Sequence, residues 1–409
     1  MTTAIEKIST RDLRFDLQGQ AGSDVTHRDP LYSYAVTQLR AGEHEGVGAA
    51  FTLGAGNDIV CQLALELARG LEGRETEELM ADWGEVSRGL ADHGRLRWLG
   101  PHKGAVHLAL ASLTNACFDL WAKSRGVPLW RLLLDLSPEE LVALLDLSYV
   151  DDVLPQDEAL RLLREAQGDR ARREGILDQG YPGYDTSVGW FGYDDETILR
   201  NAREALENGF GAIKLKVGSP DLDHDLRRVE ALREVIGAQA LLMVDANQSW
   251  SGVRAEQACR AMAALDVYWI EEPTHPDDVL AHQALARAVA PVRIAVGEHI
   301  PNRVLFKNFM QAGAVQVVQV DALRVAGVSE FLTVSLLARC FDLPVVPHVG
   351  DMGQLHQHLV LVNHIALGHA EHFLEVIPHL GERFVHPAVV EQGRYRTPQE
   401  PGTSFDFVE

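Results

Sequence analysis

Cysteine and basic residues are both scarce in this chain. Its 409 residues include four cysteines, Cys61, Cys117, Cys259 and Cys340, and none of them belongs to a CxxC pair. That spacing excludes a zinc ribbon or a disulfide framework and favours a reducing compartment. Lys and Arg number 37 against 59 Asp and Glu, so the formal net charge is −22. Because so acidic a chain repels DNA, RNA and anionic lipid, we expect no nucleic-acid partner.

Long apolar runs are absent as well. No stretch reaches the roughly 20 apolar residues that are needed to cross a bilayer. Residues 1–15 lack the apolar segment that is typical of a signal peptide. We therefore expect no membrane partner and a cytoplasmic location.

The composition is that of a folded globular protein, and its first third combines two kinds of pattern. Residues 5–17, 32–41 and 46–54 have the composition of strands. Residues 59–147 carry apolar residues at helical spacing. The polar loop 19–30 is long enough to be a functional lid. We expect a small sheet followed by helices.

From about residue 183, short strand-like runs alternate with amphipathic helical runs. Six strands are predicted, at residues 212–217, 241–246, 267–272, 293–298, 317–322 and 343–348. Such alternation indicates a parallel sheet. The repeat length is close to the roughly 30 residues per unit of a (β/α)8 barrel. A doubly wound sheet is the alternative.

Each of the six predicted strands ends in ionisable residues. In a parallel barrel the carboxyl ends of the strands form one rim, so these side chains are expected to converge on one mouth. In chain order they are Lys214 and Lys216, Asp245, Glu271 and Glu272, Glu298, Asp321 and His348.

Three of these residues form a candidate metal site. Asp245, Glu271 and Glu298 would place three like charges close together, which requires a counter-charge. A hard divalent cation supplies it, and ligation by oxygen alone suits Mg²⁺. The alternative, in which each acid caps the helix after its own strand, does not account for three acids in register.

The two lysines are candidates for a general base. Lys214 and Lys216 are two residues apart on a strand and therefore face the same side. Burial beneath helices would be costly, so we expect them to point into the mouth. Each would then lower the pKa of the other and make a base near neutral pH. A structural salt bridge to the acids is the alternative for Lys214.

His348 and Asp321 end consecutive strands and can form a pair. The carboxylate would fix the tautomer of the imidazole and raise its basicity. A cation flanked by a lysine base and a histidine indicates abstraction of a proton next to a carboxylate, with the cation stabilising the enediolate.

These residues lie in motifs that resemble the enolase superfamily, mandelate racemase subgroup. The motifs are KLK (214–216), VDANQSW (244–250), WIEEPTHPDD (269–278), VGEH (296–299), VVQVDALRVAGVSE (317–330) and VVPH (345–348). Within the subgroup, residues 115–146, 180–196 and 302–312 are most similar to the L-fuconate dehydratase-like sugar acid dehydratases. The resemblance implies an α/β fold in which residues 151–379 form a modified (β/α)8 TIM-type barrel. Residues 1–150 would form an α+β capping domain, completed by residues 380–409.

The resemblance also implies an activity, the Mg²⁺-dependent dehydration of an aldonate to a 2-keto-3-deoxy sugar acid. Lys216 would take the C2 proton, and Lys214 would contact the substrate carboxylate. His348, supported by Asp321, would protonate the departing 3-hydroxyl. The residues implied to bind Mg²⁺ are Asp245, Glu271 and Glu298, and those implied to face substrate are Asn247 and Glu375.

Two segments depart from the L-fuconate dehydratase pattern, VGDMGQLHQHL (349–359) and HIPNR (299–303). Both lie at the predicted rim, so the identity of the sugar acid stays open. Asp351 in the first segment is expected to contact substrate. His27 and Arg28 in loop 19–30 could reach an anionic substrate from above, with plain surface positions as the equal alternative.

Other functions fit the chain less well. The pair His356 and His358 could indicate a zinc hydrolase of the barrel type. Such enzymes typically have their HxH pair on the first barrel strand, whereas this pair lies late in the chain. A catalytically silent relative is disfavoured because no predicted ligand is missing. Racemisation or epimerisation of a 2-hydroxy acid by Lys216 and His348 remains an alternative. We also expect a homo-oligomer.

Overall fold

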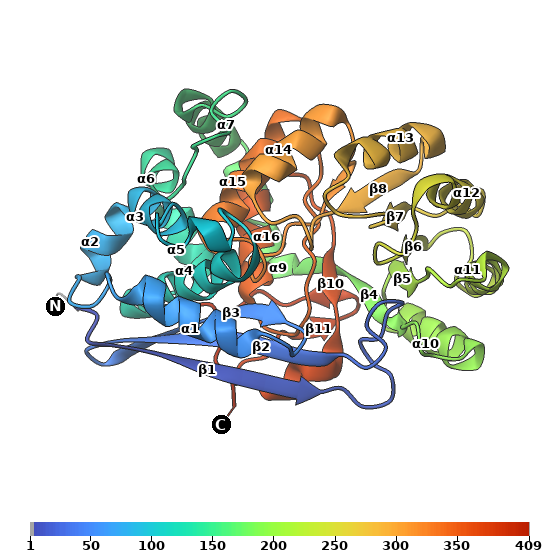
Figure 1. Ribbon diagram of the computed structural model, residues 1–409, viewed down its shortest axis with the longest axis horizontal. Helices are drawn as coiled ribbons and strands as arrows, with labels where there is room; N and C mark the ends of the chain where they lie inside the picture. Colours follow the sequence, from blue (N-terminus) through green and yellow to red (C-terminus); the bar gives the residue numbers. More distant parts are fainter. Residues whose placement is uncertain (1–3, 409) are drawn as a thin grey trace.

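An antiparallel sheet begins the chain. The computed structural model of the protein describes residues 4–408. The sheet has the order β1 (Lys7–Asp16), β2 (Leu31–Ala41), β3 (His44–Thr52) and runs along the lower edge of the view in Figure 1. These strands follow the three predicted ones closely.

The long helix α4 (Gly104–Ser124) packs directly on β3 because two glycines clear the way. A Cβ on Gly46 would lie 2.4 Å from the carbonyl oxygen of Ala116. A Cβ on Gly48 would lie 2.1 Å from the amide nitrogen of the same residue. The two glycines are two residues apart and so share one face of the strand. Only glycine permits this close approach of backbone to backbone.

The predicted helical region is helical. The helices α2 and α3 meet at Asp82, and Ser137 and Glu140 form a capping box at the start of α6. All four cysteines are free. The helices besides α4 are α1 (Asn57–Ala68), α2 (Thr76–Ala81), α3 (Trp83–Ala91), α5 (Leu129–Asp135), α6 (Pro138–Ala143), α7 (Gln156–Gln167), α8 (Arg170–Arg173) and α9 (Ile176–Gln179), with the short 3₁₀ helix η1 (Arg97–Leu99).

The rest of the chain forms a parallel barrel, which confirms the predicted fold. Its strands pair in chain order from β4 to β9, and β10 returns to pair with β4. The strands are β4 (Tyr181–Gly189), β5 (Ala212–Lys216), β6 (Leu241–Asp245), β7 (Trp269–Glu271), β8 (Arg293–Val296), β9 (Val317–Val318) and β10 (Leu374–Val376). The intervening helices are α10 (Asp195–Glu207), α11 (Leu222–Ile236), α12 (Gly252–Ala263), α13 (Val279–Val289), α14 (Arg303–Ala312), α15 (Val328–Cys340) and α16 (Leu355–Ile365).

Two barrel positions differ from the sequence-based expectation. The strand predicted at 343–348 is only a single parallel bridge between Val345 and Val318. The first barrel strand, β4, was not among the six predicted strands. Its sequence YPGYDTSVG contains proline and two glycines, which weaken the strand pattern. The boundaries at residues 150 and 379 stay a prediction.

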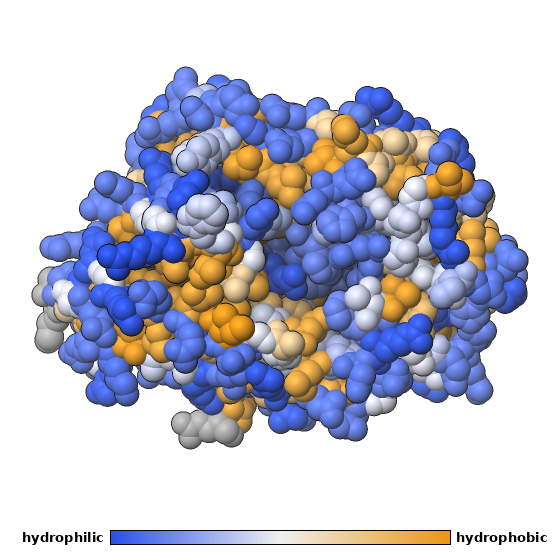
Figure 2. Space-filling model, viewed as in Figure 1, coloured by the Kyte–Doolittle hydropathy of each residue, from blue (hydrophilic) through white to orange (hydrophobic). Residues whose placement is uncertain are grey.

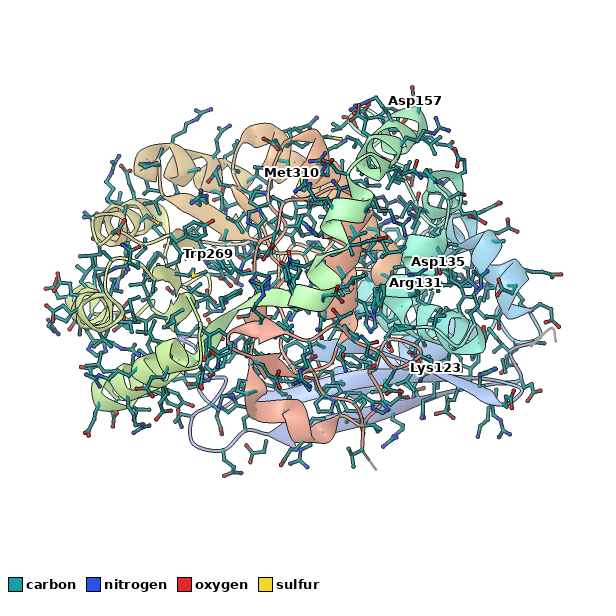
Figure 3. All side chains as sticks on the ribbon, turned by 180° about the vertical axis from the view of Figure 1, so that it is seen from behind. Lys123, Arg131, Asp135, Asp157, Trp269 and Met310 are labelled. Atoms are coloured by element: carbon teal, nitrogen blue, oxygen red, sulfur yellow. The ribbon has the colours of Figure 1, made fainter. Side chains whose placement is uncertain are left out.

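The barrel interior is filled beneath its rim. One apolar residue from each of seven consecutive barrel positions joins a separate buried cluster, and Trp269 of this cluster is labelled in the view from behind (Figure 3). A packed layer of this kind makes the barrel a core rather than a pore. Its members are Tyr184, Ala212, Met243, Trp269, Ala295, Val317 and Val346.

After the barrel the chain runs beside β4 before it returns to the N-terminal part. The 3₁₀ helix η2 (Pro378–Arg383) is followed by the short strands β11 (Val390–Glu391) and β12 (Arg394–Tyr395), and β12 pairs antiparallel with β4. The later residues return to the N-terminal part, where Lys123 of α4 contacts Asp406 at 2.8 Å. Within residues 4–408, no helix is both long and apolar enough to cross a membrane.

Candidate active site

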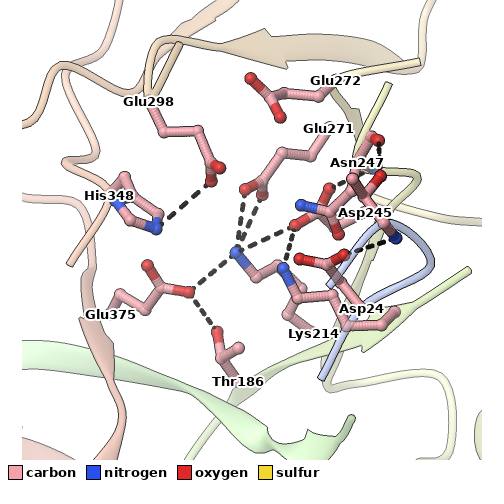
Figure 4. A network of polar contacts seen from close by, with 12 residues as sticks. Asp24, Thr186, Lys214, Asp245, Asn247, Glu271, Glu272, Glu298, His348 and Glu375 are labelled. Carbon is pink, nitrogen blue, oxygen red and sulfur yellow. Dashed lines mark hydrogen bonds and ion pairs between the residues drawn. The ribbon is translucent and has the colours of Figure 1, made fainter. Parts of the chain in front are cut away.

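The strand register brings the predicted rim residues together. Lys216 pairs with Asp245 across β5 and β6, and Asp245 pairs with Glu271 across β6 and β7. Each of the three is the last residue of its strand. Adjacent strand ends therefore place the ammonium group of Lys216 beside two carboxylates, and Figure 4 shows how closely Asp245 and Glu271 lie.

Asp245, Glu271 and Glu298 form a buried carboxylate cluster. One oxygen from each lies within 4.8 Å of the others. Glu298 follows Gly297, where a Cβ would lie 2.2 Å from the backbone carbon of Gln319, so this backbone must stay close to its neighbour. Glu298 Oε2 is buried and accepts no hydrogen bond from any described residue. Three buried carboxylates supply only oxygen atoms, a donor set that fits Mg²⁺.

The ionisation of Glu271 reflects this crowding. Burial and the neighbouring charge of Asp245 raise its pKa to about 8, although Lys214 opposes the shift. Like charges this close favour protonation of one of them unless a cation is bound. A bound cation would relieve this repulsion.

Lys214 lies below the rim and is fully buried. Its Nζ lies 2.9 Å from Glu271 Oε1 and 2.8 Å from Glu375 Oε1. Burial would lower its pKa, but these carboxylates hold the pKa well above the ordinary value. Lys214 is not among the residues that line the cavity described below. The structure therefore places it in a salt-bridge network, the alternative that its sequence position left open.

Lys216 lies at the rim, with its Nζ 2.5 Å from Asp245 Oδ2 and 5.8 Å from the centre of the Trp190 ring. Burial would lower its pKa, and so does the charge of Lys214, but Asp245, Glu298 and Asp24 together raise the pKa above the ordinary value. The sequence predicted that Lys214 would lower the pKa of Lys216. This prediction is wrong for the protein without a bound metal ion, because the nearby carboxylates outweigh the effect of Lys214.

His348 and Asp321 form the predicted pair. His348 Nδ1 lies 2.7 Å from Asp321 Oδ2, and His348 Nε2 lies 3.3 Å from Glu298 Oε2. Burial would lower the pKa of His348, but Glu298 and the hydrogen bond to Asp321 raise the pKa to about 9. At neutral pH the ring is therefore protonated and can donate a proton.

A cavity of about 310 Å³ lies at this rim, and Figure 2 shows a hydrophilic hollow in the middle of the molecular face. Lys216, Glu298 and His348 line it. Glu375 lines it too, and its Oε2 accepts a hydrogen bond of 2.9 Å from the Val349 amide. The side-chain oxygen of Asn247, another lining residue, is buried and has no partner among the described residues.

Loop 19–30 closes one side of the cavity through an aspartate that the sequence interpretation missed. Asp24 accepts hydrogen bonds from the Thr26 and His27 amides, at 2.7 and 2.6 Å, and lies 3.0 Å from His27 Nδ1. Asp24 and His27 both line the cavity. The Asx turn of Asp24-Val-Thr-His is the signal that could have identified it.

Two predicted substrate contacts are not brought to the cavity. Arg28 is exposed and does not line it. Asp351 is buried and does not line the cavity, and its Oδ1 accepts a hydrogen bond of 2.8 Å from the Gly353 amide. Burial raises the pKa of Asp351 to about 6, and the charge of His356 opposes the shift.

The sequence interpretation also missed His299 and Arg324 as cavity-lining residues. His299 Nδ1 lies 2.9 Å from Glu272 Oε1 and 3.2 Å from Glu298 Oε1. Burial would lower the pKa of His299, but Glu272 and Glu298 raise the pKa to about 10. His299 directly follows the predicted ligand Glu298, and Arg324 lies three residues after Asp321, so their nearness to predicted rim residues is the signal that could have found them.

The His356–His358 pair does not form a metal site. Both lie on α16, but His356 Nε2 contacts Asp321 Oδ1 at 3.0 Å, whereas His358 Nδ1 accepts a hydrogen bond of 3.2 Å from the Trp130 amide. Residues two apart on a helix point in different directions. The zinc-hydrolase alternative therefore has no support here.

Comparison with known proteins gives close relatives over nearly the whole chain. Human mitochondrial enolase superfamily member 1 is 39% identical, covering 99% of this chain and 94% of that protein. Its crystal structure superimposes with a TM-score of 0.96 and covers 100% of this chain and 95% of that chain. L-galactonate dehydratase of Hypocrea jecorina is 39% identical, covering 97% of this chain and 90% of that protein.

A more distant relative was solved with ligands. The structure of L-talarate/galactarate dehydratase from Salmonella typhimurium LT2, with Mg and L-lyxarohydroxamate, is 27% identical, has a TM-score of 0.80 and covers 100% of this chain and 92% of that chain. The family model described as enolase C-terminal domain-like matches residues 197–409. With the barrel and its rim, these matches show that the chain belongs to the enolase superfamily.

Proposed function

We propose that this protein is a Mg²⁺-dependent sugar acid dehydratase. The observation that carries the proposal is that Lys216 and His348 line one cavity together with Glu298, a member of the buried carboxylate cluster. A base, an acid and a metal site in one cavity suit the removal of a proton next to a carboxylate. Relatives named L-galactonate dehydratase and L-talarate/galactarate dehydratase support this reaction class.

In the proposed reaction Lys216 Nζ, in its neutral form, takes the C2 proton of an L-fuconate-like aldonate, and the electrons of the C–H bond form an enediolate. His348 Nε2 then donates its proton as the C3–O bond breaks, and water leaves. The resulting enol tautomerises to the 2-keto-3-deoxy acid. Mg²⁺ held by Asp245, Glu271 and Glu298 would stabilise the negative charge on the substrate carboxylate.

The residues around this pair would position it. Asp321 holds His348 by its Nδ1, which leaves Nε2 on the cavity side. Lys214, through its contacts with Glu271 and Glu375, would fix a metal ligand and a cavity wall rather than touch substrate. Asn247, Glu375 and His27 would face the substrate hydroxyls or carboxylate, since all three line the cavity.

The test is a screen of a sugar acid library with Mg²⁺, in which semicarbazide detects 2-keto-3-deoxy products. Product from at least one aldonate is the expected result. The same reactions in D₂O identify the alternative, because racemisation or epimerisation would put deuterium at C2 without keto product. A library that gives neither result would contradict the proposal. The homo-oligomer and the cytoplasmic location stay predictions.

A further inference from the structure

Arg228 is a buried arginine to which the proposed reaction gives no role. It lies on α11, the helix that follows β5 in the chain. The residue is only 4% exposed and does not line the cavity. Because a buried guanidinium is costly unless its N–H groups find acceptors, the atoms that accept its hydrogen bonds show which parts of the molecule it holds.

Both acceptors are backbone carbonyl oxygens of residues that line the cavity. Nη1 of Arg228 donates a hydrogen bond of 3.4 Å to the carbonyl of Lys216, and Nη2 donates one of 3.3 Å to the carbonyl of Trp190. Lys216 is the last residue of β5, and Trp190 directly follows β4. Since β4 and β5 pair in parallel, one planar guanidinium joins the carboxyl ends of two neighbouring barrel strands.

Carboxylates do not take the place of these carbonyls. Among the described residues, only the carboxylate of Asp195 lies within 4.0 Å of Arg228, with Oδ1 3.8 Å from Nε, and its side chain is 68% exposed. Nε itself is buried and donates no hydrogen bond to any described residue. Because an ion pair with so exposed a partner contributes little, the two carbonyls are the main partners of the guanidinium.

The same helix also holds the loop that follows Lys216. Asp225 of α11 accepts hydrogen bonds from the amides of Gly218 and Ser219 with its Oδ2, at 2.8 and 2.7 Å. Asp225 is fully buried as well. The helix therefore grips the end of β5 twice, at the carbonyl of Lys216 through Arg228 and at the next amides through Asp225.

The two carbonyls that Arg228 holds belong to residues whose side chains meet at the proposed base. Lys216 Nζ lies 5.8 Å from the centre of the Trp190 ring. A shift of either strand end would move Nζ relative to the C2 proton of a bound substrate. Since a base must lie within about 2.6–3.2 Å of the atom whose proton it takes, a small shift is enough to slow proton removal.

We propose that Arg228 is a positioning residue for the base of the reaction. By bonding the carbonyls of Lys216 and Trp190 together, it fixes the distance between the ends of β4 and β5 and so the place of Nζ in the cavity. Arg228 touches neither substrate nor metal in this role. The inference rests on the proposed dehydratase function and adds to it a residue outside the cavity.

The test measures kcat, KM and the isotope effect of the wild type and of Arg228 variants, with Mg²⁺ and the best sugar acid from the screen. Arg228→Leu removes both donors. We expect kcat to fall about 10-fold or more, because misplacement of a reacting group by about 1 Å can cost about 10²-fold, and KM to change less. Arg228→Lys can reach only one carbonyl at a time and should fall between the wild type and Arg228→Leu.

The isotope effect identifies the step that is slowed. The ratio of kcat for substrate with hydrogen at C2 to kcat for substrate with deuterium there reports how far proton removal limits the rate. A misplaced Lys216 slows proton removal, so the ratio in Arg228→Leu should equal or exceed that of the wild type. A merely structural role would lower the melting temperature and leave kcat unchanged well below it.

Arg233→Leu is the matched control. Arg233 lies on the same helix and also donates to backbone carbonyls, those of Gly237, Ala240 and Asp266, none of which lines the cavity. Its kcat should be that of the wild type.

A wild-type kcat in folded Arg228→Leu, or a fall in kcat with a smaller isotope effect, would overturn the inference while the dehydratase function stands. If Arg228→Leu does not fold, Arg228→Lys decides by the same two measurements. A wild-type enzyme that makes no keto product from any acid contradicts the proposed function itself.

Discussion

Lys216 and Asp245 face each other in the register of β5 and β6, with Nζ 2.5 Å from Oδ2. The proposed base and a proposed metal ligand are thus joined in one buried ion pair. The same carboxylate that holds the lysine protonated belongs to the cluster that fits a cation. Engagement of Asp245 by Mg²⁺ would loosen its hold on Lys216, so metal binding and base strength are expected to be coupled.

Replacement of Lys216 by alanine is expected to abolish turnover and leave the fold intact. Loss of a general base typically costs about 10²–10⁴-fold in rate. Both keto product and C2 deuteration should disappear, because both need the proton to leave C2. Activity near that of the wild type on the true substrate would show that another group is the base. A melting curve close to that of the wild type is the control for folding.

Substitutions of the neighbouring residues Glu271 and Glu272 can show which carboxylates bind the metal ion. Glu298 belongs both to the cluster with Asp245 and Glu271 and to a second cluster with Glu272 and His299. Mg²⁺ that binds only the folded protein raises its melting temperature. Glu271→Gln is expected to lose this rise, whereas Glu272→Gln should keep it, because Glu272 is already paired with protonated His299. The opposite pattern would place the metal in the second cluster.

Much of this site could be predicted because its signal is local. A strand followed by an acid at intervals of one βα unit places that acid at the rim of a parallel barrel, whichever helices intervene. Asp245, Glu271 and Glu298 were found in this way. The same reasoning could not find β4, whose proline and glycines hide the strand pattern and which is held in place by its neighbours β5 and β10.

The position of Asp24 and the pKa of Lys216 could not be predicted, because both depend on contacts between segments that are far apart in the chain. Asp24 reaches the cavity only because its loop docks on the barrel, where Ser23 accepts a hydrogen bond of 3.0 Å from the Phe191 amide. The pKa of Lys216 was predicted from Lys214 alone, and the 2.5 Å contact with Asp245 reverses the direction. Such pairings form between segments far apart in the chain.

Removal of the metal should stop the reaction reversibly. Exhaustive treatment with EDTA is expected to abolish keto product, because the enediolate then lacks its stabilising charge. Addition of Mg²⁺ should restore the rate, and the melting temperature should rise in parallel. Full activity of the enzyme after EDTA treatment would rule out the metal-dependent reaction.

Replacement of His348 by asparagine should separate the two proton transfers. The asparagine amide can keep the contact of Nδ1 with Asp321 but has no counterpart of Nε2. Dehydration is expected to fall by about 10²–10⁴-fold, as for loss of a general acid. Deuterium should still enter C2 in D₂O, because Lys216 is unchanged. If exchange and dehydration are lost together with the fold intact, His348 also takes part in the first step.

The ion pair of Asp146 and Arg303 predicts how stability depends on pH. Arg303 Nη2 lies 2.5 Å from Asp146 Oδ2, and both side chains are buried. Burial would raise the pKa of Asp146, but the charge of Arg303 and the hydrogen bonds from Ser148 hold the pKa below the ordinary value. The folded state therefore binds the proton less tightly than the unfolded state. The resulting stabilisation is complete above the unfolded pKa of about 3.9 and is lost as the pH falls through the folded value.

Asp146→Asn should therefore unfold at a lower temperature than the wild type at neutral pH. Loss of one partner of a buried pair costs about 3–5 kcal/mol, and the remaining contact of Arg303 with Glu330 at 2.9 Å places the effect at the lower end. The gap in melting temperature should stay constant down to about pH 4 and narrow below it, as the wild-type carboxylate takes up its proton. Asp151→Asn, at an exposed aspartate nearby, is the control and should show no gap. A gap that widens as the pH falls would mean that the pKa of Asp146 is raised in the folded protein.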